Sequence, residues 1–415
     1  MGPGNTTDLL PRAATRRLEA LLRALPVVVV TGPRQTGKTS LVQLLTGTAL
    51  AGHAAFDLDD PVVRGAASAD PTAFVRQAPL MIVDEVQRVP ELMLAVKTEV
   101  DREHQRTKGR FVLTGSANLL MLRQVSDSLA GRAAYLPVQP MTRREVLGLG
   151  TTGMWARFFE LPFEEWREAL VDDPGPREAW RDVARRGGFP VPALHLDPGA
   201  RREWFTSYVA TYLERDLRDL SAVGDLGDFR RAMQALALRA GTPVNHADVA
   251  RELGLVGRTL LRWLELLDVT YQLARLQAYT VRRATRLRKR PKFYWNDPAL
   301  AMHVAGETEP SGVHLETLLF TDLRAWAALE ADRATLHYWR DDAGREVDFV
   351  VERDGRTLAI EVKATRRPGP GDWKHLKHFV AEYGRSCAGA LLLHDGDETL
   401  RVADRIVAAP WWRAF

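Results

Sequence analysis

A glycine-containing loop near the start of the chain has the residue types and spacing that phosphate binding requires. Residues 32–39, GPRQTGKT, satisfy the pattern G-x-x-x-x-G-K-[ST] between an apolar β-branched run and a stretch with helical spacing. In such a loop backbone N–H groups converge on phosphate, and the following helix adds its positive end. We expect Lys38 to reach the β- and γ-phosphates of a nucleotide and Thr39 to ligate Mg²⁺. The predicted nucleotide-binding residues are Gly32, Pro33, Arg34, Gln35, Thr36, Gly37, Lys38, Thr39 and Ser40.

Two consecutive carboxylates follow a second apolar run. The segment 79–92, PLMIVDEVQRVPEL, reads as a short buried strand that ends at Asp84 and Glu85. After a phosphate-binding loop, this pair is typical of a site in which Asp84 holds the magnesium shell and Glu85 polarises the attacking water.

A third apolar strand, in residues 110–121, RFVLTGSANLLM, delivers polar groups to the same sheet edge. We expect Ser116 or Asn118 to sense the γ-phosphate or orient water, although Ser and Asn are also ordinary turn residues. Arg132 precedes a last strand. It is a candidate arginine finger, for its own nucleotide or a neighbour's, and the alternative is a structural cation.

A second group of chemically competent residues lies near the end of the chain. Asp348 and Glu361 fall on a predicted β-hairpin with RDGR as its turn, and Lys363 follows Glu361 by two residues on the same face. Glu316 lies on a preceding predicted helix. Carboxylates that clamp a cation can stabilise the charge that develops in phosphodiester hydrolysis, which is the chemistry that such a set could perform.

A basic segment indicates a polyanionic partner. Residues 281–295, VRRATRLRKRPKFYW, contain no acidic residue, and their positive charge would attract phosphate backbones, although a solvated loop is the alternative. Residues 245–268 predict two helices with a glycine-marked turn, typical of a DNA-reading helix pair or of a winged-helix packing module. The predicted nucleic-acid-binding residues are Arg282, Arg283, Arg286, Arg288, Lys289, Arg290 and Lys292.

The stretches TGPRQTGKTS, IVDEVQRVPEL, LTGSAN and LAGR resemble a large bacterial and archaeal family of AAA-type ATPases. The resemblance implies an additional-strand P-loop fold, ATP hydrolysis and assembly into rings or dimers. The rest of the chain resembles the C-terminal region paired with these ATPases. The Asp348, Glu361 and Lys363 spacing resembles the PD-(D/E)xK nuclease core, which implies Mg²⁺ on the two carboxylates, a lysine that activates water and a helix glutamate, here Glu316. Val347 stands where that motif often has proline.

The elements that position these residues must belong to several domains, because a chain of 415 residues is too long to fold around a single ordinary hydrophobic core. We predict an α/β protein. Its expected parts are a P-loop ATPase domain with a parallel sheet (1–150), a helical connector (151–200), a helical or winged-helix-like region (201–295) and a restriction-endonuclease-like α/β domain (296–415).

Composition narrows the class of protein. One cysteine excludes an internal disulfide framework and fits a reducing cytoplasm, and the apolar runs are too short to cross a membrane. The formal net charge of +4 is mild, so local clustering of charge matters more than the total.

The leading hypothesis is a cytoplasmic, homo-oligomeric ATPase that uses ATP and Mg²⁺ to remodel or translocate nucleic acid, expected to be DNA. One alternative is an ATP-gated nuclease. Another is a nucleotide-dependent switch or signalling ATPase with a protein partner and an inactive nuclease-like domain.

Overall fold

The computed structural model describes residues 9–103, 107–115, 129–173, 175–211, 225–281, 286, 289–331 and 333–415. The chain divides into two compact units. The first comprises Met1–Met141, Glu145–Thr151 and Val269–Gln272, and the second comprises Thr142–Arg144, Thr152–Asp268 and Leu273–Phe415. The finer four-part division expected from the sequence stays a prediction.

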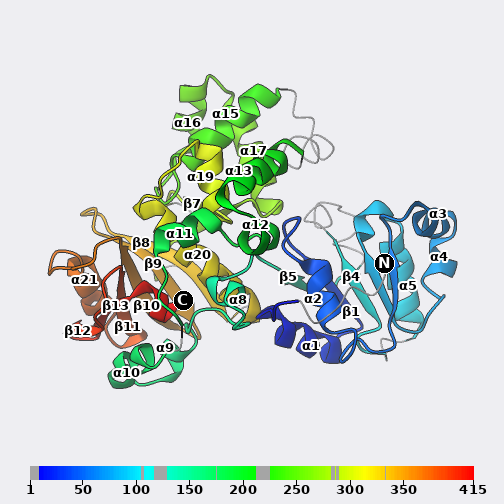
Figure 1. The fold of residues 1–415 in the computed structure, drawn as a ribbon, viewed down its shortest axis with the longest axis horizontal. Helices are drawn as coiled ribbons and strands as arrows, with labels where there is room; N and C mark the ends of the chain where they lie inside the picture. The colour runs from blue at the N-terminus through cyan, green and yellow to red at the C-terminus, as the bar shows by residue number, and fades with distance from the viewer. Residues whose placement is uncertain are drawn as a thin grey trace. The chain divides into compact units, whose positions relative to one another are not determined.

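The first unit is built around a five-stranded parallel sheet in the order β2-β3-β4-β1-β5 (Figure 1). Its elements in chain order are α1 (Ala14–Ala24), β1 (Val27–Thr31), α2 (Lys38–Leu44), β2 (Ala54–Asp57), α3 (Pro61–Ala69), α4 (Pro71–Phe74), β3 (Met81–Asp84), a 3₁₀ turn (Val86–Arg88), α5 (Leu92–Arg102), β4 (Phe111–Thr114) and β5 (Ala133–Pro137). Helix α8 (Arg143–Val146) includes residues of both units.

The central strands of this sheet form because they are short, β-branched or apolar, and buried. Every residue of β1, VVVVT, is buried, as parallel strands covered on both faces require. Val27 and Val29 pack with Leu113 and with Val96 of α5 in one hydrophobic cluster. Since β1, β3 and β4 run parallel, their carboxyl ends share one edge, and the predicted phosphate loop and Asp84 both fall on it.

The second unit contains a longer mixed sheet in the order β12-β13-β11-β10-β9-β8-β6-β7. Its elements in chain order are α9 (Arg157–Glu160), a 3₁₀ turn (Phe163–Glu165), α10 (Trp166–Val171), α11 (Trp180–Arg186), α12 (Pro190–His195), α13 (Pro198–Tyr208), α15 (Leu226–Ala237), α16 (His246–Leu253), α17 (Gly257–Val269), β6 (Leu273–Ala278), β7 (Lys292–Trp295), α19 (Pro298–Ala305), α20 (Gly312–Leu329), β8 (Ala334–Arg340), β9 (Glu346–Arg353), β10 (Arg356–Lys363), α21 (Lys374–Tyr383), a 3₁₀ turn (Gly384–Ser386), β11 (Cys387–His394), β12 (Leu400–Ala403), β13 (Ile406–Pro410) and α22 (Trp411–Ala414).

The hairpin predicted between Asp348 and Lys363 is confirmed. Strands β9 and β10 pair antiparallel, and the turn places Asp354 and Gly355 at φ 49° and 79°, the left-handed conformation of a tight two-residue hairpin. Side chains of neighbouring residues of β10 pack in two different hydrophobic clusters. Ile360 packs in a cluster with residues of α20, and Ala359 packs in a cluster with residues of α21. The two helices therefore cover opposite faces of the sheet.

The segment expected to be a connector contributes to the core of the C-terminal sheet. Trp155, Trp166 and Trp180 are buried in the same cluster as Ile360 and Trp411. Aromatic side chains of this size bury too much apolar area to remain on a solvated linker.

The helix pair expected in the middle of the chain is present. The Asn245 side chain caps α16 through the Ala247 N–H, and Gly254 ends the helix in the left-handed conformation. After α17, β6 and β7 pair antiparallel, so a two-stranded hairpin follows the helix pair, as the winged-helix prediction requires. Strand β6 also pairs with β8, which joins this hairpin to the C-terminal sheet.

In the part of the chain that the structure describes, no helix combines the length and the apolar composition needed to traverse a lipid bilayer.

Candidate functional site

The loop between β1 and α2 has the backbone conformation of a phosphate cradle. Gly32, Gln35 and Gly37 have φ values of 136°, 60° and 84°, and successive positive and negative φ turn backbone N–H groups toward a common centre. A Cβ on Gly32 would lie 2.3 Å from the Val138 carbonyl oxygen, so only glycine fits there. The sequence motif and the local structure therefore agree.

Lys38 begins α2 and lies inside this loop. Its Nζ donates hydrogen bonds to the carbonyl oxygens of Pro33 at 2.7 Å and Gly32 at 3.3 Å. Burial lowers the pKa of Lys38 to about 8, partly offset by the charges of Glu85 and Asp84. Among the described residues this buried ammonium donates to carbonyl oxygens, and it provides a binding partner for an anion.

Thr39 and Asp84 meet as the magnesium hypothesis requires. The Thr39 hydroxyl donates to Asp84 Oδ2 at 2.8 Å. The other carboxylate oxygen, Oδ1, accepts from the Thr114 hydroxyl at the end of β4 and from the Glu85 N–H at 3.1 Å. Thr114 thus orients Asp84, a role that the sequence analysis did not assign. The signal in the sequence that could have indicated this role is the position of Thr114 as the last residue of an apolar strand.

Glu85 follows β3 in the left-handed conformation, at φ 55°. A non-glycine residue in this region stores backbone strain, which is common where a side chain must be aimed at a reaction centre. Its carboxylate accepts a hydrogen bond from the Gln87 side chain. Burial raises the pKa of Glu85.

The other predicted residues of this site do not all lie at the phosphate loop. Arg34 lies in the loop and Ser40 lies in α2. Ser116 and Asn118 lie outside the described residues. Arg132 precedes β5, and the Val27 N–H donates to its carbonyl oxygen, which places it at the amino end of the strands. The phosphate loop follows the carboxyl end of β1, so Arg132 lies at the sheet edge opposite its own loop. Its guanidinium pairs with Asp101 at 2.5 and 2.9 Å.

The structure gathers the predicted C-terminal residues as a second cluster. The Val362 N–H donates to Asp348 Oδ2 at 2.9 Å, and Lys363 Nζ donates to Glu361 Oε1 at 2.6 Å. Glu361 Oε2 is buried and has no hydrogen-bond partner among the described residues. Burial and the charge of Asp348 raise the pKa of Glu361 to about 8.

Glu316 joins this cluster from α20. The Tyr294 hydroxyl donates to Glu316 Oε2 at 3.1 Å, and burial together with the charge of Asp348 raises the pKa of Glu316 to about 8. The neighbouring Glu361 and Asp348 raise the pKa of Lys363 to about 12, although burial opposes this shift. Within the described ranges, no group of three or more His, Cys, Asp or Glu side chains is arranged to hold a metal ion.

Two residues of the predicted basic surface are instead in the interior. Lys292 is 1% exposed in β7 and pairs with Glu346 at 2.5 Å, and its charge acts on Glu316. Arg286 is 8% exposed and pairs with Glu352 at 2.7 Å. The prediction that these two residues contact phosphate from the surface is wrong for this structure. Strand β7 carries Lys292 inward, and Arg286 is held by Glu352, the Thr280 carbonyl oxygen and the ring of Tyr279.

Of the other predicted residues of the basic segment, two are among the described residues and three are not. Lys289 Nζ donates to the Arg340 carbonyl oxygen at 2.7 Å, and Arg290 is exposed. Arg282, Arg283 and Arg288 lie outside the described residues.

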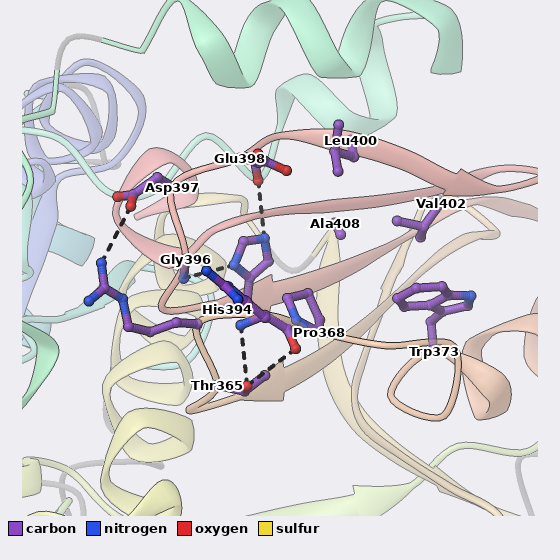
Figure 2. A pocket seen from close by; sticks show the side chains of 12 residues that line it. Thr365, Pro368, Trp373, His394, Gly396, Asp397, Glu398, Leu400, Val402 and Ala408 are labelled. Atoms are coloured by element: carbon purple, nitrogen blue, oxygen red, sulfur yellow. Dashed lines mark hydrogen bonds and ion pairs between the residues drawn. The ribbon is translucent and has the colours of Figure 1, made fainter.

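A cavity of about 840 Å³ opens where β10 and β11 end. Lys363 and His394 are paired neighbours at these strand ends, and Thr365 and His394 line the cavity. Figure 2 shows Trp373 and Val402 at one end of it and Thr365 and Asp397 at the other. The cavity therefore lies at the end of the strand that carries Glu361 and Lys363, and it has one apolar and one polar end.

Three stretches of the chain match known protein families. Residues 25–147 match a family described as AAA domain. Residues 177–311 and 311–414 match two families that are each described as a domain of unknown function, DUF8612 and DUF4143. The first match spans β1 to β5, so the parallel sheet of the first unit is the part of the chain that is similar to AAA domains.

Relatives of nearly the same extent occur in mycobacteria. Uncharacterized proteins of Mycobacterium tuberculosis and Mycobacterium bovis are each 29% identical over 408 residues, which cover 96% of this chain and 83% of the relative.

Solved structures with similarity to this chain include the Walker-type ATPase of Pyrococcus abyssi, 15% identical over 72% of this chain and 99% of that one, with a TM-score of 0.40. The RuvB Holliday junction branch migration motor of Thermotoga maritima is 18% identical over 68% and 95%, with a TM-score of 0.30. The Aeropyrum pernix ORC1 protein in complex with DNA is 14% identical over 74% and 95%, with a TM-score of 0.28.

Proposed function

We propose that this protein is a Mg²⁺-dependent ATPase whose hydrolysis cycle remodels or translocates bound DNA. The observation that carries the ATPase half is the 2.8 Å contact between Thr39 Oγ1 and Asp84 Oδ2, next to the buried ammonium of Lys38 and the carboxylate of Glu85. These four side chains lie at or just after the carboxyl ends of β1 and β3, at the sheet edge where ligands of open α/β sheets bind.

The donor set fits magnesium. Mg²⁺ prefers oxygen ligands and is held in nucleotide sites by one or two protein oxygens together with substrate phosphates. Thr39 and Asp84 offer one hydroxyl and one carboxylate at adjacent positions, and they would hold the ion. When bound, the ion would neutralise charge on the phosphates.

The remaining chemistry belongs to the side chains. Lys38 exchanges its carbonyl contacts for phosphate oxygens and orients them, Glu85 orients and polarises the attacking water, and Thr114 keeps the Asp84 carboxylate fixed through its second oxygen.

The DNA half rests on the basic segment between β6 and β7. In the sequence this segment contains Arg282, Arg283, Arg288, Lys289 and Arg290, and it connects β6 to β7 after the helix pair α16 and α17. A segment with clustered positive charge attracts a phosphate backbone and releases its counterions.

A DNA titration of the ATPase tests this half. We expect duplex or branched DNA to raise turnover and DNA affinity to fall steeply with salt. The double variant Arg282→Glu, Arg283→Glu should lose most of the stimulation, whereas Arg202→Glu, an exposed arginine on α13, should keep it. If DNA neither binds at low salt nor changes turnover, while ATP still changes the oligomeric state, the protein is a nucleotide switch for another partner.

A nuclease gated by ATP is the second candidate, favoured by the assembly of Glu316, Asp348, Glu361 and Lys363 in one cluster. Their arrangement does not meet the geometry of a metal centre within the described residues, so no cleavage step is assigned. Incubation with plasmid DNA, Mg²⁺ and ATP tests this candidate. Cleavage that disappears in Asp348→Ala while ATP turnover persists would establish the nuclease activity.

A further inference from the structure

Arg12, just before α1, is a buried arginine that contacts the phosphate loop. It is 7% exposed, and its guanidinium donates three hydrogen bonds. Nη1 donates to the Thr36 carbonyl oxygen at 2.7 Å, Nη2 to the Gln139 carbonyl oxygen at 3.0 Å, and Nε to Glu145 Oε1 at 3.0 Å. One side chain therefore connects the loop after β1 with the segment after β5.

Glu145 fixes the position of this guanidinium. It is 3% exposed, and the oxygen that accepts from Arg12 also accepts from the Ala13 N–H at 2.7 Å. The residue before Arg12 is held as well: a Cβ added to Gly150 would lie 2.8 Å from Pro11 Cβ, so glycine allows this close approach. A buried, charge-paired arginine with three acceptors is rigid.

The contact with Thr36 has a consequence for the next peptide group. The Thr36–Gly37 peptide bond is trans, since the chain has no cis bond among its described residues, and in a trans peptide the C=O and the N–H point in opposite directions. By holding the Thr36 C=O, Arg12 directs the Gly37 N–H away from itself. Gly37 immediately precedes Lys38, whose ammonium marks the inside of the loop.

We propose that Arg12, held by Glu145, is a positioning residue for nucleotide binding: it sets the Thr36–Gly37 peptide so that the Gly37 N–H donates to a phosphate of ATP. This inference rests on the proposed ATPase function and assigns a role to a residue outside the phosphate-binding motif. The loop is thereby ordered before the nucleotide arrives, which lowers the entropy cost of binding.

The experiment compares Arg12→Lys, Arg12→Gln and Glu145→Gln with the wild-type full-length chain. The matched control is Arg16→Gln, because Arg16 is an exposed arginine in the first turn of the adjacent helix α1. Circular dichroism establishes the folded fraction of each protein. Calorimetry with Mg·ATP gives Kd, and steady-state turnover per folded molecule gives KM and kcat.

We expect Kd and KM for ATP to rise about tenfold in Arg12→Lys, the equivalent of one lost hydrogen bond to phosphate. The rise should be larger in Arg12→Gln and intermediate in Glu145→Gln, with kcat per folded molecule within about threefold of wild type. Arg16→Gln should match wild type.

An unchanged Kd and KM in the folded Arg12→Lys and Glu145→Gln proteins would overturn the inference, and Arg12 would then serve only the stability of the first unit. If wild-type protein itself does not bind ATP, the proposed ATPase function fails and this inference fails with it.

Discussion

Replacing Glu85 with glutamine should separate ATP binding from ATP hydrolysis. Glutamine has the same shape, so it keeps the contact with Gln87, and the Thr39–Asp84 hydrogen bond is untouched. What it lacks is the carboxylate charge that polarises water. Loss of such a group typically reduces turnover by about 100-fold to 10,000-fold, which corresponds to about 3 to 5 kcal/mol of barrier.

The assay is steady-state phosphate release at saturating Mg·ATP, together with calorimetric titration of the same preparation. We expect kcat to fall within the range above and Kd for ATP to stay within about threefold of wild type. Glu91→Gln is the matched control, because Glu91 is an exposed glutamate in the same connection. Turnover of Glu85→Gln within threefold of wild type would show that Glu85 does not act on the water, and the assignment of this site would have to change.

Three further predictions concern the first unit. Gly32→Ala should abolish ATP binding and lower the free energy of unfolding by at least about 2 kcal/mol, because the added Cβ would lie 2.3 Å from the Val138 carbonyl oxygen. The control is Gly131→Ala, which should bind ATP normally, because Gly131 also has a positive φ, 74°, but a Cβ there would meet no neighbouring atom of the described residues. Hydrogen bonds from Arg102, Arg76 and Arg110 lower the pKa of Glu99 from 4.5 to about 2, although burial opposes this shift. Glu99→Gln should therefore lower the free energy of unfolding by about 3 kcal/mol above pH 5. A difference in stability between wild type and variant that does not shrink as the pH falls toward 2 would contradict this assignment. Arg132→Ala and Lys38→Ala should each be inactive alone but regain ATP turnover when the two variants are mixed. The reason is that Arg132 lies at the sheet edge opposite its own phosphate loop and would serve a neighbouring subunit. If mixing restores no turnover, Arg132 is a structural partner of Asp101.

The loop between β1 and α2 and the carboxylates after β3 could be predicted from the sequence because the pattern that specifies them is local. A loop that wraps phosphate needs glycines and a lysine within a few residues, and the strand before Asp84 and Glu85 is short and apolar. The hairpin that carries Asp348 and Glu361 was predictable for the same reason, since alternating strands and the Asp354–Gly355 turn are adjacent in the chain.

The contacts that the sequence did not reveal are long-range. Arg12 reaches Thr36 and Glu145, which are brought together only when β1 and β5 pair. Lys292 belongs to a basic run in the sequence, but the pairing of β7 with β6, and of β6 with β8, moves it into the interior beside Glu346. Strand pairing between distant segments leaves no periodic signal in either segment.

Calorimetric titration of Mg·ATP into wild-type and Lys38→Ala protein tests the central claim most directly. Among the described residues the buried ammonium of Lys38 donates to two carbonyl oxygens, so its removal should leave the fold intact by circular dichroism. The account predicts saturable ATP binding by the wild type and a loss of at least about 100-fold in affinity in the variant, the effect of one charged hydrogen-bonded contact. Equal affinity in the two proteins, or no binding by the wild type, would contradict it.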